Sequence, residues 1–597
     1  MGTPRKQSWW KRLVFGCVFA GFLVALLLGG TEAVLRLANY GHAPGFWRKE
    51  KDAEGRVWIR ENWWVTAPYF APELMRRPHA FRLPEKKDPA AYRIFVLGSS
   101  AAMGDPEPSF SMARVLETLL RTAYPKVRFE VINAAVTAIN SNVVRGIAAD
   151  CAELQPDLFI VYEGNNEVIG PFGPATVFTP VLRRPGAIRA AIFLRGLRVG
   201  QLVSRLARGA NPEQQSLNEW GGMQMFLKHE IAADDPRLET TEALFRDNLR
   251  AIVESGEKVG ATVLLANVLT NQKDLAPFRS RHSANVSPEQ AAACDRAIGD
   301  GHQKIAARDF AAAETDFRAA TKADDGFAEA HFQLGRILLR EGKSGEAHVE
   351  FQRAIDLDTL RFRTDSRLNR AIADTAQETK ATFVDLVAAA EKDSPGGILG
   401  DELLYEHVHL TFRGTYDVAV QLFGQVSEDL KKRGRVSEAA VPLRIDEARE
   451  RLAFTTYEQA MIVKQMLSRF QHAPFTEQSN IRERITTYSQ RDARAAQLLS
   501  MPESAPALFA IYDAAIAANP SDWVLRRNYG MALVSLGRPD RAKPQLLAAL
   551  AVIPDDPDTL YGLILAHRAL GETAEAARRT EQLRKLEPRY PGLAELR

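Results

Sequence analysis

The sequence predicts an α/β fold in which helices cover both faces of a parallel sheet as three αβα layers, joined to all-α repeats and an N-terminal transmembrane helix. Three observations support this prediction. Short apolar runs alternate with segments of helical spacing between residues 93 and 386. Small and aromatic positions recur 34 residues apart in two regions. An uncharged apolar run over residues 13–30 follows a basic start.

The composition is that of an ordinary globular chain. Its 597 residues are enough for several domains, and 46% of them are hydrophobic and 25% charged. The formal net charge of +3 is close to zero for this length, so we expect no nucleic-acid partner. The three cysteines, Cys17, Cys151 and Cys294, allow at most one disulfide outside the apolar run and form no CxxC metal pair.

The apolar run over residues 13–30 predicts a signal anchor. Its eighteen residues would form a helix of about 27 Å, roughly one hydrocarbon core. The basic tail of residues 1–12 favours a cytoplasmic N-terminus, which places the bulk of the chain in the periplasm or at the cell surface. The alternatives are a cleaved signal peptide, for which the run is long and lacks a clear Ala-x-Ala site, and a buried core helix.

Residues 31–92 are predicted to form an irregular juxtamembrane linker. They combine several prolines with four tryptophans, Trp47, Trp58, Trp63 and Trp64. These aromatic side chains would lie at the membrane interface or pack on the following domain.

Five short apolar runs predict the strands of the sheet. They cover residues 93–97, 129–132, 157–162, 262–266 and 382–386. Helical spacing is found at residues 110–121, 143–154 and 245–259. Continuous apolar strands that alternate with helices indicate a parallel sheet buried on both faces. Functional groups in such sheets gather at the carboxyl ends of the strands.

A long excursion separates the third strand from the fourth. Its residues 187–208 have apolar side chains at helical spacing with arginines between them. This segment would lie on an anionic membrane surface, act as a lid, or form a surface helix with a solvated basic face, which is the simplest interpretation.

Two regions repeat with a period of 34 residues. In the first, Gly301, Ala313, Phe317 and Ala320 recur as Gly335, Ala347, Phe351 and Ala354. In the second, Pro520, Pro554 and Pro588 share this spacing, with Gly530, Ala542, Leu546 and Ala576 in phase. Small residues let paired helices approach while the aromatic ring fills the gap between them.

These positions resemble tetratricopeptide repeats. The resemblance covers about residues 290–358 and 489–590. We therefore expect an inserted repeat pair at 297–358 and C-terminal repeats at 489–597, with a helical connector at 431–488 between the domains. Such repeats bind peptides or proteins, so the resemblance implies a protein partner.

Four separated segments carry polar residues that suit one site. Three of them follow directly on predicted strands: Gly98-Ser99-Ser100, the stretch from Asn133 to Asn140, and Gly164-Asn165-Asn166-Glu167. The fourth is Glu406-His407-Val408-His409. Each has a plainer structural interpretation as a turn or a structural histidine, so only the combination is informative.

The residue types in these segments suit acyl transfer. A serine at the start of a helix stands beside free backbone N–H groups that can bind an oxyanion. A side-chain amide can donate to the same oxyanion without a titratable charge. The carboxylate of Glu406 can accept from one ring nitrogen of His409 and leave the other facing the serine. Two histidines also suit a metal site, but no other His or Cys cluster supplies further ligands.

In this order on an alternating α/β chain, the four segments resemble the blocks of the SGNH/GDSL hydrolase superfamily, over residues 93–296 and 359–430. The resemblance implies Ser100 as nucleophile, His409 as base and Glu406 as its orienting carboxylate. It implies an oxyanion hole made by the backbone N–H groups of Ser100 and Ala138 and the amide of Asn166. No metal or organic cofactor is required.

The sequence departs from the pattern of this superfamily at four positions. Ser99, Glu167 and Glu406 replace Asp, and Ala138 replaces Gly. Ser99 is the second candidate nucleophile and His407 the second candidate base. We expect an anchored extracytoplasmic esterase or O-acyltransferase whose ester substrate is an envelope or surface glycan or a lipid. The alternative is a weak or inactive scaffold that assembles partners through its repeats.

Overall fold

The computed structural model describes residues 9–179, 181–182, 184–209 and 221–596. Its central sheet has five strands in the order β5-β4-β6-β7-β8, all parallel, which confirms the predicted parallel sheet. The strands are β4 (Ala91–Gly98), β5 (Arg128–Asn133), β6 (Leu158–Tyr162), β7 (Thr262–Ala266) and β8 (Thr382–Val384). Every residue of β4 and β6 is buried, as expected for strands covered on both faces.

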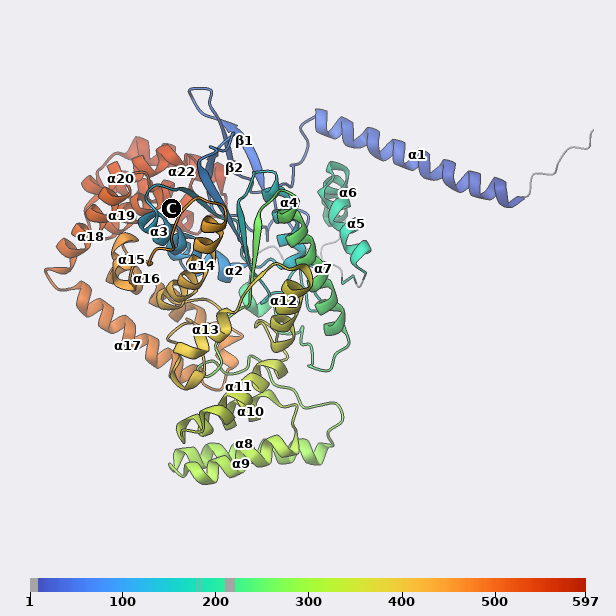
Figure 1. The fold of residues 1–597 in the computed structure, drawn as a ribbon, viewed down its shortest axis with the longest axis vertical. Coiled ribbons are helices and arrows are strands. Elements are labelled where there is room, and N and C mark those ends of the chain that lie inside the picture. The colour runs from blue at the N-terminus through green and yellow to red at the C-terminus, as the bar shows by residue number, and fades with distance from the viewer. Residues whose placement is uncertain (1–8, 180, 183, 210–220, 597) are drawn as a thin grey trace, which may run out of the picture.

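Helices lie on both sides of this sheet (Figure 1). On one side α3 (Met112–Ala123) packs against α14 (Phe412–Lys432). On the other side α7 (Arg237–Glu257) packs against α4 (Ser141–Ala152) and α12 (Ser366–Thr379). β8 is shorter than its predicted run, because the side chain of Asp385 caps the following helix α13 (Leu386–Asp393).

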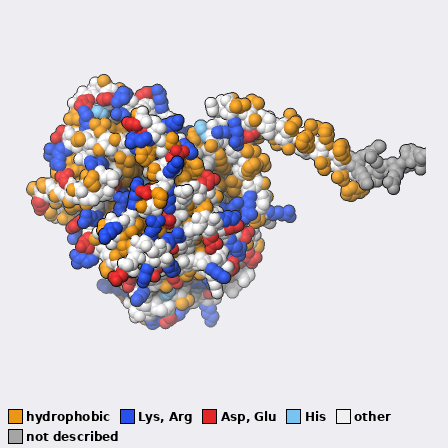
Figure 2. Space-filling model, turned by 45° about the horizontal axis from the view of Figure 1, so that its top comes forward, with side chains coloured by type: hydrophobic (Ala, Val, Ile, Leu, Met, Phe, Trp, Pro, Cys, Tyr) orange, Lys and Arg blue, Asp and Glu red, His pale blue; other side chains and the backbone are white. Residues whose placement is uncertain are grey.

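An apolar helix, α1 (Trp9–Leu37), stands clear of the body of the molecule (Figure 2). Within it, residues 13–37 are long and apolar enough to cross a membrane, and their hydrophobic side chains are exposed. After the central strand β6, the chain forms two further helices beside the end of α1, which are α5 (Pro185–Gly196) and α6 (Arg198–Gly209).

Residues 31–92 do not form the irregular linker that the prolines and tryptophans predicted. They build an antiparallel sheet of β1 (Trp47–Lys51), β2 (Val57–Glu61) and β3 (Arg82–Pro84). Most residues of β1 are charged, so the strand shows no apolar alternation in the sequence. In β2, the ion pair Arg60–Glu61 is buried by tertiary contacts. The tryptophans pack on protein: Trp47 donates to the carbonyl of Asp150 at 3.0 Å.

The inserted repeats are two helical hairpins. They comprise α8 (Pro288–Ala306), α9 (Phe310–Ala323), α10 (Ala328–Arg340) and α11 (Ser344–Leu357). A Cβ on Gly301 would lie 2.7 Å from the ring of Phe317, and one on Gly335 would lie 3.0 Å from that of Phe351. The recurring glycines therefore allow the helix contact predicted from sequence. α8 starts before residue 297 because Ser287 and Gln290 form a capping box.

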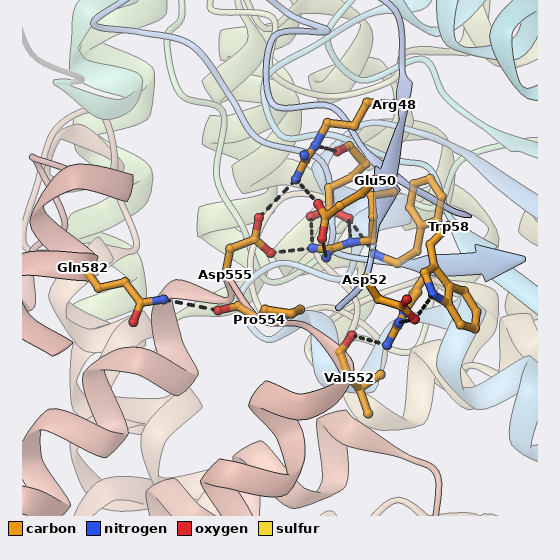
Figure 3. Close-up of polar contacts among 12 residues, drawn as sticks. Arg48, Glu50, Asp52, Trp58, Val552, Pro554, Asp555 and Gln582 are labelled. Carbon is orange, nitrogen blue, oxygen red and sulfur yellow. Dashed lines mark hydrogen bonds and ion pairs between the residues drawn. The ribbon is translucent and has the colours of Figure 1, made fainter. Parts of the chain in front are cut away.

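The remaining helices form the connector and the C-terminal repeats. The connector contains α15 (Ile445–Arg451) and α16 (Thr456–Phe470), and α17 (Ile481–Leu499) leads into the repeats. These are α18 (Ser504–Ala518), α19 (Trp523–Ser535), α20 (Pro539–Val552), α21 (Pro557–Ala569), α22 (Thr573–Leu586) and the short α23 (Gly592–Glu595). Loops of this block hold the small sheet: Asp555 pairs with Arg60 at 2.5 Å and with Arg48 at 3.2 Å (Figure 3).

Candidate active site

Ser100 lies where strand β4 turns into the short helix α2 (Ser100–Met103). The turn depends on Gly98, which has a φ of +157°, and a Cβ there would collide with the carbonyl of Tyr162 on the neighbouring strand. This tight turn aims Ser100 at the carboxyl edge of the sheet, where its side chain lines a pocket of about 830 Å³.

The structure brings Ser100, His409 and Glu406 together. Nε2 of His409 lies 2.8 Å from Oγ of Ser100. Nδ1 of the same ring contacts Oε1 of Glu406, whose carboxylate is fully buried. The carboxylate also accepts from the backbone N–H of His407 at 2.7 Å and of His409 at 3.3 Å. This is the arrangement in which a carboxylate orients a histidine toward a nucleophile.

A closed loop in front of α14 holds this histidine. Leu404 and Leu410 form an isolated antiparallel bridge, and the backbone N–H of Tyr405 donates to the carbonyl of His409 at 2.8 Å. Thr411 then caps α14 by accepting from the N–H of Gly414. The spacing of Glu406 and His409 therefore places both side chains on the inside of one tight loop.

The two second-choice residues are placed differently. Ser99 is fully buried and donates from Oγ to Oδ1 of Asn165 at 2.9 Å, away from His409. The ring of His407 contacts the other carboxylate oxygen of Glu406 and packs against Phe278, with ring centroids 5.3 Å apart. Burial lowers the pKa of His407 well below its ordinary value. Neither Ser99 nor His407 takes part in the hydrogen bond between Ser100 and His409.

Ala138 and Asn166 both line the pocket beside Ser100. Nδ2 of Asn166 donates to the carbonyl of Ile139 at 2.9 Å, which fixes the amide and leaves its second N–H. Ala138 has a φ of +61°, a left-handed conformation that costs an alanine about 1–2 kcal/mol. Ala138, which stands where the superfamily pattern has glycine, therefore has a backbone conformation that favours glycine.

Glu167 supports the wall of the site. Its carboxylate accepts from the backbone N–H of Ser141 at 2.8 Å and from Oγ of Ser141 at 2.7 Å, at the start of α4. Burial raises the pKa of Glu167 to about 7. This contact ties the segment of Asn166 to the segment of Ala138, and it explains why an acidic residue suits this position.

Sequence reasoning missed an ion pair that touches the histidine. Arg469 of the connector helix α16 pairs with Asp105 at 2.7 Å, and its Nη1 lies 3.3 Å from Nδ1 of His409 and 3.8 Å from Glu406. Oδ2 of Asp105 lies 3.3 Å from Nε2 of His409. No motif marks Arg469, because it reaches the site only through the packing of α16.

This ion pair bears on the charge of His409. Burial lowers the pKa of His409 to about 4, a shift that Asp105 opposes and Arg469 reinforces. Burial raises the pKa of Asp105, but Arg469 and then His409 outweigh it, so the net shift is downward. His409 is therefore neutral at pH 7, as a general base must be.

Two groups of side chains line the pocket, called here its apolar side and its polar side; within the apolar group, Phe226 meets both Phe178 and Phe362 edge to face. The apolar side is formed by Ile169, Phe178, Met223, Phe226, Phe362 and Phe475. The polar side is formed by Arg76, Asp105, Gln465, Ser468, Arg469 and His472. Ser100 and His409 line the same pocket.

Glu406, His407 and His409 also place ligand atoms within 4.8 Å of one another, which is metal-like spacing. In this cluster Nδ1 of His409 already contacts Glu406, and Nε2 faces Ser100. Arg469 lies 3.8 Å from the same carboxylate and balances its charge. The contacts of these three residues thus fit a hydrogen-bonded relay to Ser100.

Comparison with known families confirms the repeats. The tetratricopeptide repeat family model matches residues 301–360 and 530–583, so the chain contains tetratricopeptide repeats in both predicted regions. No curated protein matches the chain.

Solved repeat structures are also similar to parts of the chain. The crystal structure of YrrB, a tetratricopeptide protein with an unusual peptide-binding site, is 13% identical, covers 50% of this chain and 89% of its own, and has a TM-score of 0.13. The TPR2AB domain of yeast Sti1 in its pHSP90 complex is 14% identical, covers 51% of this chain and 95% of its own, and has a TM-score of 0.14.

Proposed function

We propose that the chain is a membrane-anchored serine esterase or O-acyltransferase with Ser100 as its nucleophile. The observation that carries the proposal is the 2.8 Å contact between His409 and Ser100, with Glu406 on the other ring nitrogen. The four sequence segments that resemble SGNH/GDSL hydrolases support it, because they meet at one edge of a parallel sheet.

In the proposed reaction, Nε2 of His409 takes the hydroxyl proton of Ser100 as Oγ attacks the ester carbonyl. The backbone N–H groups of Ser100 and Ala138 and the amide of Asn166 hold the oxyanion. When the intermediate collapses, the ester C–O bond breaks and the leaving alcohol takes the proton from His409. Water or an acceptor hydroxyl then attacks the acyl-serine by the same steps in reverse.

The two-sided pocket supports an ester with unlike halves. The aromatic side suits an acyl chain, and the arginine side suits a hydroxylated or anionic acceptor such as an envelope glycan or a lipid headgroup. The helix over residues 13–37 would anchor the enzyme, and the basic residues before it favour an extracytoplasmic body.

The repeats support a protein partner. Tetratricopeptide repeats commonly mediate protein–protein interaction, and those of this chain form two separate blocks. The second candidate function is a scaffold with a weak or inactive site. The strained Ala138 backbone favours it, because a Cβ in the oxyanion hole weakens catalysis.

A direct experiment is hydrolysis of a short-chain aryl ester by the purified full chain in detergent. We expect turnover that Ser100→Ala reduces at least about 10,000-fold, as in other serine triads. Ser99→Ala is the matched control, because Ser99 lies next in sequence but bonds Asn165. Equal activity in the wild type and Ser100→Ala would reject the proposal.

A further inference from the structure

Helices α5 and α6 lie beside the end of the apolar helix α1 (Figure 1). The Glu32 carboxylate of α1 accepts a hydrogen bond from the backbone N–H of Val199, in the first turn of α6, at 3.0 Å. The Gln201 side chain donates to the carbonyl of His42 at 2.8 Å and accepts from its N–H at 2.9 Å. Because Glu32 follows the run of residues 13–30 almost directly, α6 begins next to the point where α1 would leave a bilayer.

The surface of this helical hairpin combines apolar side chains with cations. Four large apolar residues are exposed over 52–66% of their surface: Phe193, Leu194, Val203 and Leu206. Residues 181–209 contain no Asp or Glu, and their arginines include the exposed Arg184, Arg189 and Arg205. Exposed apolar residues together with arginines are the composition of a helix that lies in the interface of an anionic bilayer.

The same excursion of the chain builds the apolar side of the pocket. Ile169 and Phe178 line it before the hairpin, and Met223 and Phe226 line it afterwards. The rings of Phe178 and Phe226 meet edge to face at 5.6 Å. The excursion between β6 and β7 therefore contains both the α5–α6 hairpin and part of the apolar pocket wall, and its chain before and after the hairpin meets at the site.

We propose that the α5–α6 hairpin lies on the surface of an anionic bilayer beside α1 and holds the apolar side of the pocket toward the lipid, so that the substrate is an acyl ester carried by a membrane lipid. The reaction in this proposal rests on the proposed function. The position of the hairpin does not, since it follows from the contacts with α1 and from the exposed side chains.

The position is tested by fluorescence with the full chain in nanodiscs that contain phosphatidylglycerol and a lipid-attached quencher. A Cys17→Ser background removes the exposed thiol, since Cys151 and Cys294 are buried. A polarity-sensitive dye is placed by Phe193→Cys or Leu206→Cys. The control is Val349→Cys, which is 66% exposed on α11 of the inserted repeats.

We expect the dyes at 193 and 206 to be blue-shifted and quenched by the lipid, and the dye at 349 to be neither. Quenching should weaken in pure phosphatidylcholine, because the arginines then lose their anionic partners. Equal quenching at all three positions, or no quenching at 193 and 206, would overturn the proposal.

Substrate delivery is tested with Arg189→Gln/Arg205→Gln, which lies outside the pocket. We expect hydrolysis of acyl esters in the nanodisc to fall at least about tenfold, while hydrolysis of a soluble aryl ester stays unchanged. Equal effects on both substrates would overturn lipid delivery. If no ester is hydrolysed at all, the proposed function fails, and the fluorescence result still decides where the hairpin lies.

Discussion

The site at the carboxyl edge of the sheet and the interface of the C-terminal repeats are both built from charged residues, but they use them differently. In the site, Glu406 is fully buried, and its carboxylate contacts both the backbone N–H and the ring of His409. At the interface, Arg77 and Glu587 pair at 2.7 Å with nearly a third of each side chain exposed. A buried polar group held in one arrangement suits a chemical role, whereas partly exposed ion pairs suit the positioning of a neighbouring block.

This comparison predicts that changes in the site lower the rate with little effect on folding, and that changes at the interface do the opposite. The largest effect below the loss of Ser100 is expected for Asn166→Ala, which removes one proposed oxyanion donor. It should lower kcat by about 100- to 1000-fold. Steady-state kinetics checks this.

The matched control for Asn166 is Asn248→Ala. Asn248 is also buried, but its amide donates to Oγ of Ser141 and Oδ1 of Asn142, both at 3.0 Å, behind the site. It should lower the melting temperature and leave kcat within a few-fold of the wild type. A larger kcat loss in Asn248→Ala than in Asn166→Ala would break the distinction between the two regions.

The second expected effect is on the pH profile. His409 must be neutral to act, and its pKa is lowered to about 4, so kcat/KM should fall only as the pH drops through that value. Arg469→Gln removes a cation that lowers this pKa and frees Asp105, which raises it. The acid limb should therefore move to higher pH.

Asp105→Asn is the opposing variant, because Asp105 raises the pKa of His409. It should move the acid limb to lower pH. The pH dependence of kcat/KM for the two variants measures both shifts, and movement of both limbs in the same direction would show that the ion pair does not act through His409.

A smaller effect is expected at the repeat interface. Asp555→Asn weakens the pairs with Arg60 and Arg48 and should destabilise the chain by about 1–3 kcal/mol, because the buried Arg60 loses its 2.5 Å partner and keeps only Glu61 and the more distant Glu50. Thermal unfolding measures this, with aryl ester hydrolysis of the folded protein unchanged. Loss of hydrolysis without loss of stability would show that the interface acts on the site and would contradict this prediction.

The smallest effect is expected for Ala138→Gly. The left-handed backbone strain of about 1–2 kcal/mol disappears, and the greater freedom of unfolded glycine offsets about 0.5–1 kcal/mol of the gain. Stability should rise slightly, and kcat should rise rather than fall, because a Cβ leaves the oxyanion hole. A clear drop in kcat would place Ala138 outside that hole.

Contacts could be predicted from the sequence where a short motif or a regular spacing marks the residues that make them. Glu406 and His409 lie three residues apart in one loop, and Ser100 follows the strand that positions it, so short motifs were enough to predict their meeting. The 34-residue spacing likewise predicted the contact of Gly301 with Phe317.

Contacts made only through the packing of distant elements have no motif or spacing that marks them in the sequence. Arg469 reaches His409 from 60 residues away, and nothing in its own helix marks it. The small sheet of β1 to β3 was missed because its strands are stabilised by ion pairs such as Arg60 with Asp555, which lies 495 residues further along the chain. Local hydrophobic patterns carry no information on partners of that kind.

The central claim is that Ser100 is a nucleophile activated by His409. A serine-directed fluorophosphonate probe, followed by peptide mass spectrometry, tests it without knowledge of the substrate. We expect stoichiometric labelling of Ser100, not of Ser99, and a loss of labelling in His409→Ala, whose retained fold is checked by circular dichroism. Absence of labelling in the folded wild-type chain, or labelling that persists in His409→Ala, would contradict it.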